Sequence, residues 1–106
     1  MTQSASALSQ RPVTVIGAGL GGLTAALALA QRGAEVTVIE RAPALTEVGA
    51  GIQLSPNAVR VLDALGLGEA LRDVSAPNPT VTLRDARAGE VLRMDMARLR
   101  PGAAFR

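Results

Sequence analysis

Residues 13–22 read VTVIGAGLGG, and this stretch decides the fold class. Its first four residues, Val13–Ile16, are all β-branched, which is typical of a short buried parallel strand. The glycines that follow, Gly17, Gly19 and Gly22, form the pattern G-x-G-x-x-G. Between a strand and a helix, this pattern predicts a turn that binds the phosphates of a dinucleotide.

The residues that follow the glycines predict the helix and the second strand that this pattern requires. Leu20–Arg32 is rich in Ala and Leu, which are strong helix formers, and Gly33 stands where a helix would end. Glu35–Glu40, EVTVIE, has the composition of a second parallel strand. The sequence therefore predicts an α/β protein that begins with a Rossmann-like βαβ unit for FAD or NAD(P).

Each glycine of the pattern has its own part in the expected turn. Gly17 permits the tight turn, Gly19 lets a pyrophosphate approach the backbone, and Gly22 lets the helix pack closely on the strand. Unpaired N–H groups at the helix start point toward the phosphate, and the helix dipole adds roughly 0.3–1 kcal/mol. The remaining members of the predicted cofactor-binding turn are Ala18, Leu20 and Gly21.

Glu40 closes the second strand, near the usual distance from the glycine turn. Its carboxylate is able to accept hydrogen bonds from both ribose hydroxyls of an adenosine, and it would repel a 2′-phosphate. The site should therefore prefer FAD or NAD to NADP, although Arg41 could attract such a phosphate. The competing interpretation is a plain turn with Glu40 as a solvated strand end. The agreement of strand, glycines, helix and acid favours a nucleotide site.

Residues 49–57, GAGIQLSPN, repeat the Gly-Ala-Gly triplet. Leu54 stands where the third glycine of the pattern would fall, and the preceding TEV is too short to be a strand. By itself this segment is a loop that continues from Arg41. The second triplet is therefore not expected to hold a phosphate.

Two helices are expected after this loop. Ser55 is a candidate N-cap and Pro56 a favourable first helical residue, while Gly66 is placed to end the helix. Gly68–Val74 is a candidate for a second, shorter helix.

A β-hairpin is expected near the end of the sequence, from Thr80–Arg84 and Val91–Met94. The expected organisation is a disordered tail over 1–11, an FAD-binding βαβ unit with loop and helices over 12–75, and the hairpin over 76–106. No third parallel strand is evident, so the domain is expected to be incomplete.

The composition excludes several classes of function. The chain has 106 residues, 48% of them apolar, and a net charge of +2 with charges of both signs mixed along it. Phe105 is the single aromatic residue, which counts against stacking on nucleic-acid bases. The absence of Cys and His makes a transition-metal site improbable. No signal peptide or membrane-length apolar run is present, so a cytoplasmic protein without nucleic-acid or membrane partners is expected.

Three stretches together resemble the amino-terminal end of FAD-dependent aromatic-ring monooxygenases, the class A flavoprotein hydroxylases that include salicylate hydroxylase and 3-hydroxybenzoate 6-hydroxylase. The stretches are VIGAGLGGLTAALALAQRGAEVTVIER, VGAGIQLSPNAVRVLDALGLGEAL and TLRDARAGEVL. The first is common to many flavoproteins, whereas the second is much more specific. The resemblance covers roughly residues 12 to 106.

This resemblance implies positions for the cofactor. The pyrophosphate of FAD would lie on the first glycine turn, with Glu40 at the ribose. The second triplet would line the route to the flavin, where Gly49 and Gly51 allow close backbone approach and Gln53 lies near the flavin. In such enzymes NAD(P)H reduces the flavin, which activates O2 for transfer of one oxygen atom to an aromatic, usually phenolic, small-molecule substrate. The catalytic residues and the oligomeric state stay unknown.

Alternatives remain open. One is another FAD-dependent oxidoreductase with the same turn, and another is an NAD-dependent dehydrogenase. Family members are several times longer and carry further flavin-binding motifs that do not occur in this sequence. A truncated, non-catalytic nucleotide-binding fragment is therefore expected for the chain by itself, and the ring substrate cannot be inferred from its residues.

Overall fold

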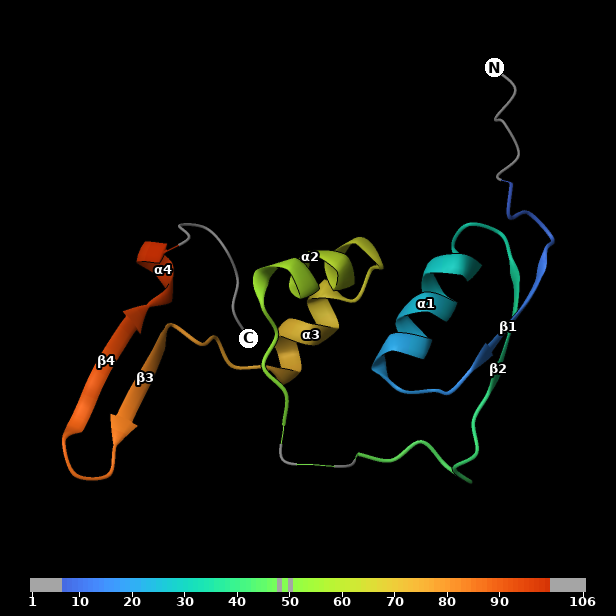
Figure 1. Ribbon diagram of the computed structural model, residues 1–106. Helices are drawn as coiled ribbons and strands as arrows, with labels where there is room; N and C mark the ends of the chain where they lie inside the picture. Colours follow the sequence, from blue (N-terminus) through green and yellow to red (C-terminus); the bar gives the residue numbers. More distant parts are fainter. Residues whose placement is uncertain (1–6, 48, 50, 100–106) are drawn as a thin grey trace, which may run out of the picture. The chain divides into compact units, whose positions relative to one another are not determined.

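The computed structural model describes residues 7–47, 49 and 51–99, and the chain forms two compact units, Met1–Gly49 and Ala50–Arg106 (Figure 1). The first unit contains strand β1 (Pro12–Ile16), helix α1 (Leu20–Ala30) and strand β2 (Glu35–Ile39). The second contains α2 (Pro56–Ala64), α3 (Gly68–Val74), β3 (Thr80–Asp85), β4 (Gly89–Asp95) and the short α4 (Met96–Leu99).

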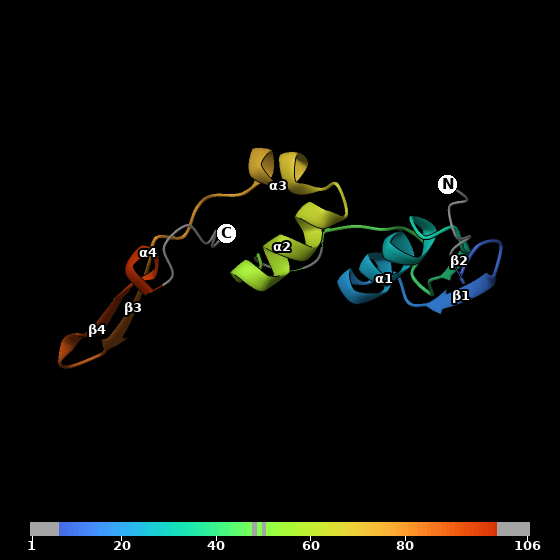
Figure 2. The same cartoon turned by 90° about the horizontal axis from the view of Figure 1, so that it is seen from above.

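The first unit is the βαβ unit that the sequence predicts. Strands β1 and β2 pair in parallel, with Val13 opposite Val36 and Val15 opposite Val38. Helix α1 connects the two strands and packs against both, as the two views of this unit show (Figures 1 and 2). The second strand ends one residue earlier than expected, so that Glu40 follows β2 directly.

Small residues form the side of α1 that meets the strands. Ala26 is buried, and Gly22 lies against the backbone of the preceding turn. Leu20 and Leu23, by contrast, are 68% and 41% exposed. Leu20 and Leu23 therefore do not lie on the packed side of this helix, where the close approach of the preceding turn leaves no room for a side chain at Gly22.

Gly33 ends the α1 region with a φ of +89°, as its position in the sequence predicts. The carbonyl of Gly33 accepts a hydrogen bond of 2.8 Å from the N–H of Gln10. Residues 7–10, in the segment where the sequence predicts a disordered tail, form a turn that this bond connects to the βαβ unit. Residues 1–6 lie outside the described residues.

In the second unit, α2 and α3 pack together around Val59 and Leu65, the two buried apolar side chains among its described residues. Ser55 is the N-cap of α2 in its backbone conformation, and Pro56 is the first helical residue. The side chain of Ser55 makes no capping bond to the backbone, and its hydroxyl donates to the side-chain oxygen of Asn57. Gly66 ends the helix with a φ of +83°.

The hairpin of β3 and β4 is antiparallel, with Val81 opposite Met94 and a register shift after Leu83. Asp85 begins its turn and accepts hydrogen bonds of 2.8 Å from the N–H groups of Arg87 and Ala88. These two bonds, that of Ala88 first, hold the pKa of the Asp85 carboxyl below its ordinary value. The predicted hairpin is confirmed, with strands slightly longer than the sequence suggests.

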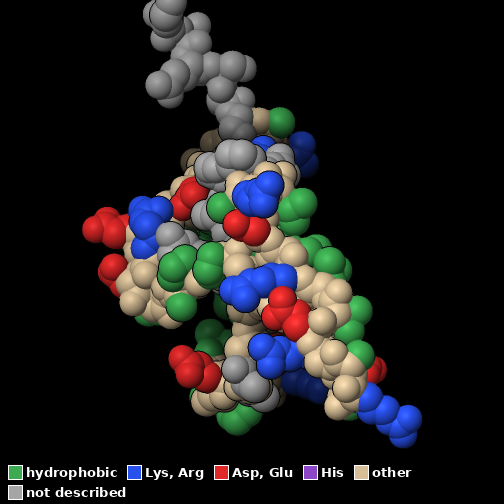
Figure 3. All heavy atoms as spheres, turned by 90° about the vertical axis from the view of Figure 1, so that its left-hand side faces the viewer, with side chains coloured by type: hydrophobic (Ala, Val, Ile, Leu, Met, Phe, Trp, Pro, Cys, Tyr) green, Lys and Arg blue, Asp and Glu red, His purple; other side chains and the backbone are tan. Residues whose placement is uncertain are grey.

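Acidic, basic and hydrophobic side chains are interspersed over the face of the molecule in Figure 3. Within the described residues, no helix is long and apolar enough to cross a bilayer. Over the same residues, no group of acidic, His or Cys side chains is arranged to hold a metal ion.

Candidate functional site

The glycine turn between β1 and α1 is the candidate site. Gly17 leaves the strand with a φ of +97°, a conformation that side chains disfavour. Its N–H donates a hydrogen bond of 2.7 Å to the carbonyl oxygen of Ile39, the last residue of β2. The turn is thus attached to the end of the neighbouring strand, and Gly17 has the tight-turn geometry that the sequence predicts.

Gly22 is where the helix touches the turn. A Cβ built at Gly22 would lie 1.9 Å from the carbonyl oxygen of Gly17 and 3.5 Å from a methyl carbon of Val15. A side chain at this position therefore collides with backbone atoms. The predicted role of Gly22 in close packing of helix and strand has a direct geometric basis.

Gly19 and Gly21 differ from Gly22. A Cβ at either position would meet no protein atom within 4 Å. The φ of Gly19 is −73°, which any residue adopts without strain. Neither the backbone conformation nor the packing of this chain therefore requires glycine at Gly19. Its lack of a side chain leaves open space in front of the turn, which fits the approach of a pyrophosphate.

Some N–H groups of the turn donate to acceptors in the protein, and others have no acceptor among the described residues. Those of Gly17 and Leu23 donate to Ile39 and Gly19 carbonyls, respectively. The first residues of a helix have no acceptor within the helix. Among the described residues, nothing accepts from the N–H groups at 20–22. Three donors at a helix start suit a phosphate, so the residues fit the pyrophosphate of a dinucleotide.

Glu40 lies beside this turn. One carboxylate oxygen accepts a hydrogen bond of 2.7 Å from the N–H of Ala18, and the other accepts one of 2.9 Å from the N–H of Ala42. The bonds from Ala18, then Ala42, and a weaker one from Arg41 hold the pKa of the Glu40 carboxyl below its ordinary value. At neutral pH the group is therefore an anion, able to accept hydrogen bonds and unable to donate them.

The structure thus brings together the residues 17–22 and Glu40. Arg41 follows Glu40 in the chain and has an exposed side chain. Gly51 and Gln53 belong to the second unit and are both exposed. Gly49 and Gly51 have φ values of +108° and +130°, so the backbone itself requires glycine at these two positions of the second triplet.

Sequence reasoning does not identify Ala42, whose N–H holds the second oxygen of Glu40. The contact is made by the backbone, so the residue type carries no signal. The sequence offers one indication of this contact, which is an acidic residue that precedes a turn, because such a side chain is able to accept from a backbone N–H two residues further on.

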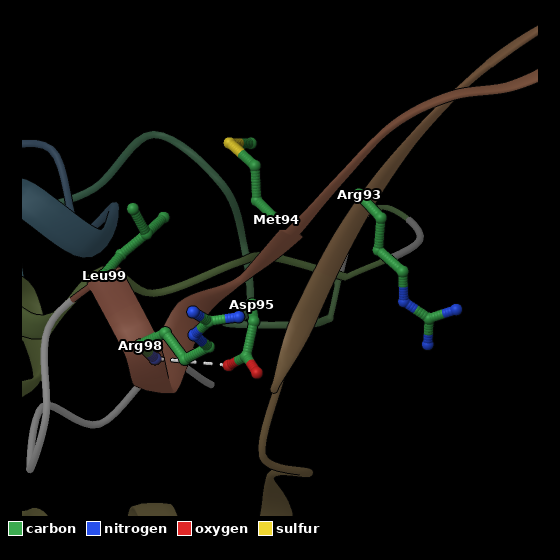
Figure 4. A pocket seen from close by; sticks show the side chains of 5 residues that line it. All are labelled: Arg93, Met94, Asp95, Arg98 and Leu99. Carbon is green, nitrogen blue, oxygen red and sulfur yellow. Dashed lines mark hydrogen bonds between the residues drawn. The ribbon is translucent and has the colours of Figure 1, made fainter.

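A hollow on β4 and α4 has a volume of about 370 Å³ and is lined by Arg93, Met94, Asp95, Arg98 and Leu99 (Figure 4). Arg93 and Met94 extend to different sides of β4 (Figure 4). One oxygen of Asp95 accepts from the N–H groups of Ala97 and Arg98, at 3.0 and 3.2 Å. These side chains do not converge on a common point, so this hollow is not the candidate site.

Residues 10–103 match the family described as FAD binding domain, and the chain belongs to this family. It is 47% identical over 95 residues to the 3-hydroxybenzoate 6-hydroxylase of Polaromonas naphthalenivorans (strain CJ2), covering 90% of this chain and 23% of that protein. It is 40% identical over 86 residues to the 6-hydroxynicotinate 3-monooxygenase of Pseudomonas fluorescens, covering 80% of this chain and 22% of that protein.

A solved structure, the tetrameric form of 2-methyl-3-hydroxypyridine-5-carboxylic acid oxygenase, superposes with a TM-score of 0.79 and 33% sequence identity. The match covers 91% of this chain and 24% of that chain. The chain therefore spans about a quarter of the length of these relatives. The resemblance to FAD-dependent aromatic-ring monooxygenases is confirmed by both comparisons.

Proposed function

We propose that the first unit binds the pyrophosphate and adenosine part of FAD, within a monooxygenase that hydroxylates an aromatic ring. The observation that carries this proposal is the turn at residues 17–22, with open space at Gly19 and three N–H groups without an acceptor among the described residues. Glu40 is the partner of the ribose, since its carboxylate oxygens retain lone pairs beyond those used by Ala18 and Ala42.

The chemistry of the reaction belongs to the cofactor. Bound FAD would supply the redox chemistry by which NAD(P)H and O2 are used to transfer an oxygen atom to the ring. The described residues of this chain hold and orient the nucleotide end of that cofactor. Gly51 and Gln53 are proposed as contacts at the flavin end, following the family resemblance.

The names of the relatives suggest a class of substrate. One relative is named for 3-hydroxybenzoate, a second for 6-hydroxynicotinate, and the solved structure for a hydroxypyridine carboxylic acid. Each is an aromatic ring that bears both a hydroxyl and a carboxyl group. We therefore propose a hydroxylated aromatic carboxylate, together with O2, as the small-molecule partner of the whole enzyme, in a soluble cytoplasmic setting.

A chimera tests this function directly. Residues 10–103 replace the matching segment of the Polaromonas hydroxylase, and the flavin content and 3-hydroxybenzoate-dependent NAD(P)H oxidation of the purified protein are measured. The chimera should retain stoichiometric FAD and activity. The same chimera with Gly19→Val should fold and lose its flavin, because the side chain occupies the space in front of the turn. A folded chimera without flavin, or a flavin content unaffected by Gly19→Val, would contradict the proposal.

A further inference from the structure

The peptide group between Gly17 and Ala18 is held from both of its sides. Its N–H, which belongs to Ala18, donates to the Glu40 carboxylate at 2.7 Å. Its carbonyl oxygen, which belongs to Gly17, faces Gly22 so closely that a Cβ there would lie 1.9 Å away. Because a peptide group is planar, the bond to its N–H and the close packing at its carbonyl oxygen together restrict the direction of the chain through the turn.

The residues of the turn need such a restraint. Four of the six residues at 17–22 are glycines, and glycine loses more conformational freedom on ordering than any other residue. The bond from the Gly17 N–H to Ile39 holds one point of the turn, and the bond from Ala18 to Glu40 holds the next. Consecutive N–H groups of the turn are thus attached to consecutive residues at the end of β2.

The carboxylate is itself fixed in place. Its second oxygen accepts from the N–H of Ala42 at 2.9 Å, two residues further along the chain. Both bonds are charge-assisted, since the acceptor is ionised, and such bonds are stronger than neutral ones. The lowered pKa of the carboxyl agrees with this geometry, because backbone N–H groups account for it.

We propose that Glu40 is a positioning residue that holds the glycine turn in its phosphate-binding conformation before any ligand arrives. This role is separate from its hydrogen bonds to a ribose, because each carboxylate oxygen has two lone pairs and gives one to the backbone. A turn that is ordered in advance binds its ligand more tightly, because less freedom is lost on binding. Removal of Glu40 should therefore weaken the binding of phosphates even when the ligand has no ribose hydroxyls.

The first measurement uses the 106-residue chain without ligand. Amide hydrogen exchange, corrected for intrinsic rates, should be about tenfold slower at Ala18 than at Gly21, whose N–H has no acceptor among the described residues. Glu40→Ala, which has no side-chain acceptor, should remove this protection, and Glu47→Ala, in the exposed loop after β2, should leave it unchanged. In the unmodified chain, the amide shifts of Ala18 and Ala42 should follow one titration, with a pKa below the ordinary carboxyl value. Equal exchange at Ala18 and Gly21, or separate titrations, would overturn the proposal.

The second measurement rests on the proposed function and compares ADP with 2′,3′-dideoxy-ADP, which lacks both ribose hydroxyls. Glu40→Ala should weaken dideoxy-ADP about tenfold and ADP by more, whereas Glu47→Ala should affect neither. If Glu40→Ala weakens ADP alone, the carboxylate acts only through the ribose and the positioning role is wrong. If the unmodified chain binds neither nucleotide although Glu40 protects Ala18, the proposed function fails and the positioning role stands on the exchange data.

Discussion

Replacement of Gly22 by Ala tests the packing of the turn against helix α1. The added Cβ would lie 1.9 Å from the Gly17 oxygen, whereas real Cβ atoms stay beyond 3.0 Å. The two groups must therefore separate by about 1 Å, which loses much of the surrounding contact energy. The oxygen cannot turn aside freely, because its peptide group donates to Glu40. The helix must shift instead, away from Val15 and the strands.

The magnitude follows from two opposing effects. Overpacking of this kind lowers the stability by about 3 kcal/mol, and the higher helix propensity of Ala raises it by about 1 kcal/mol. A net loss of stability of about 2 kcal/mol is therefore expected. Gly21→Ala is the matched control, since its Cβ would meet no atom within 4 Å and it should gain up to about 1 kcal/mol. For a chain of this size, the two variants should then differ in melting temperature by roughly 10–20 °C.

The assay is thermal unfolding of the 106-residue chain by circular dichroism, with amide NMR signals from β1 and β2 to assign the transition to the first unit. The order of stability should be Gly21→Ala, then the unmodified chain, then Gly22→Ala. If the two variants melt within about 3 °C of each other, the contact between Gly22 and the Gly17 carbonyl does not restrain the turn, and the packing explanation is wrong.

Gly19→Val in the 106-residue chain should lower stability by no more than about 1 kcal/mol, because the residue is an exposed N-cap without packing contacts; a larger loss in urea unfolding would show that its effect on flavin binding is not specific. The lowered pKa of Glu40 means that its contribution to stability is present above the ordinary value of 4.5 and is lost as the pH falls through the lower, folded value. The stability difference between the chain and Glu40→Gln should accordingly be constant at neutral pH and shrink below pH 4.5; a difference that grows with acidity would contradict this sign. Gly68→Ala should lower the stability by less than about 1 kcal/mol. Its Cβ would also lie 1.9 Å from another atom, but that atom is the end of the flexible Asp63 side chain, which is able to move aside. A loss of stability as large as that of Gly22→Ala would refute this distinction between flexible and rigid neighbours.

The sequence predicts the parts of this fold that depend on local chemistry. β-Branched runs become the paired strands, and Gly33 and Gly66 end helices with positive φ values. Asp85 forms the turn of a hairpin whose strands are predicted within a few residues. In each case the residue type restricts the backbone of its own neighbourhood, so that no knowledge of distant contacts is needed.

Features that depend on distant contacts were not predictable in the same way. The packed side of α1 is one example, since the large apolar Leu20 is 68% exposed whereas the small Ala26 is buried. The reason lies in the approach of the helix to the Gly17 carbonyl, which no helical periodicity reveals. The side chain of Ser55 also makes no capping bond and donates to the Asn57 side chain, a partner that the residue type does not reveal.

The candidate site shows the same division. Its residue types follow from the glycine pattern and from the acid after β2, but the partners of Glu40 do not. The sequence assigns this carboxylate to a ribose, whereas the structure adds two backbone donors, Ala18 and Ala42. A hydrogen bond to a backbone N–H has no signature in residue identity, so this second role becomes visible only with the geometry.

The backbone N–H donors of the glycine turn therefore have different roles, according to their position in the turn. The N–H groups of Gly17 and Ala18 are used by the protein, on Ile39 and Glu40, and that of Leu23 continues the helix on Gly19. The donors between them, at 19–22, have no acceptor among the described residues, and those at 20–22 lie at the positive end of the helix dipole. The bonds on either side restrict the direction of these donors, because they hold the backbone immediately before and after them. A turn of flexible glycines thereby presents ordered N–H groups to a phosphate, and Glu40 contributes to that order from the neighbouring strand.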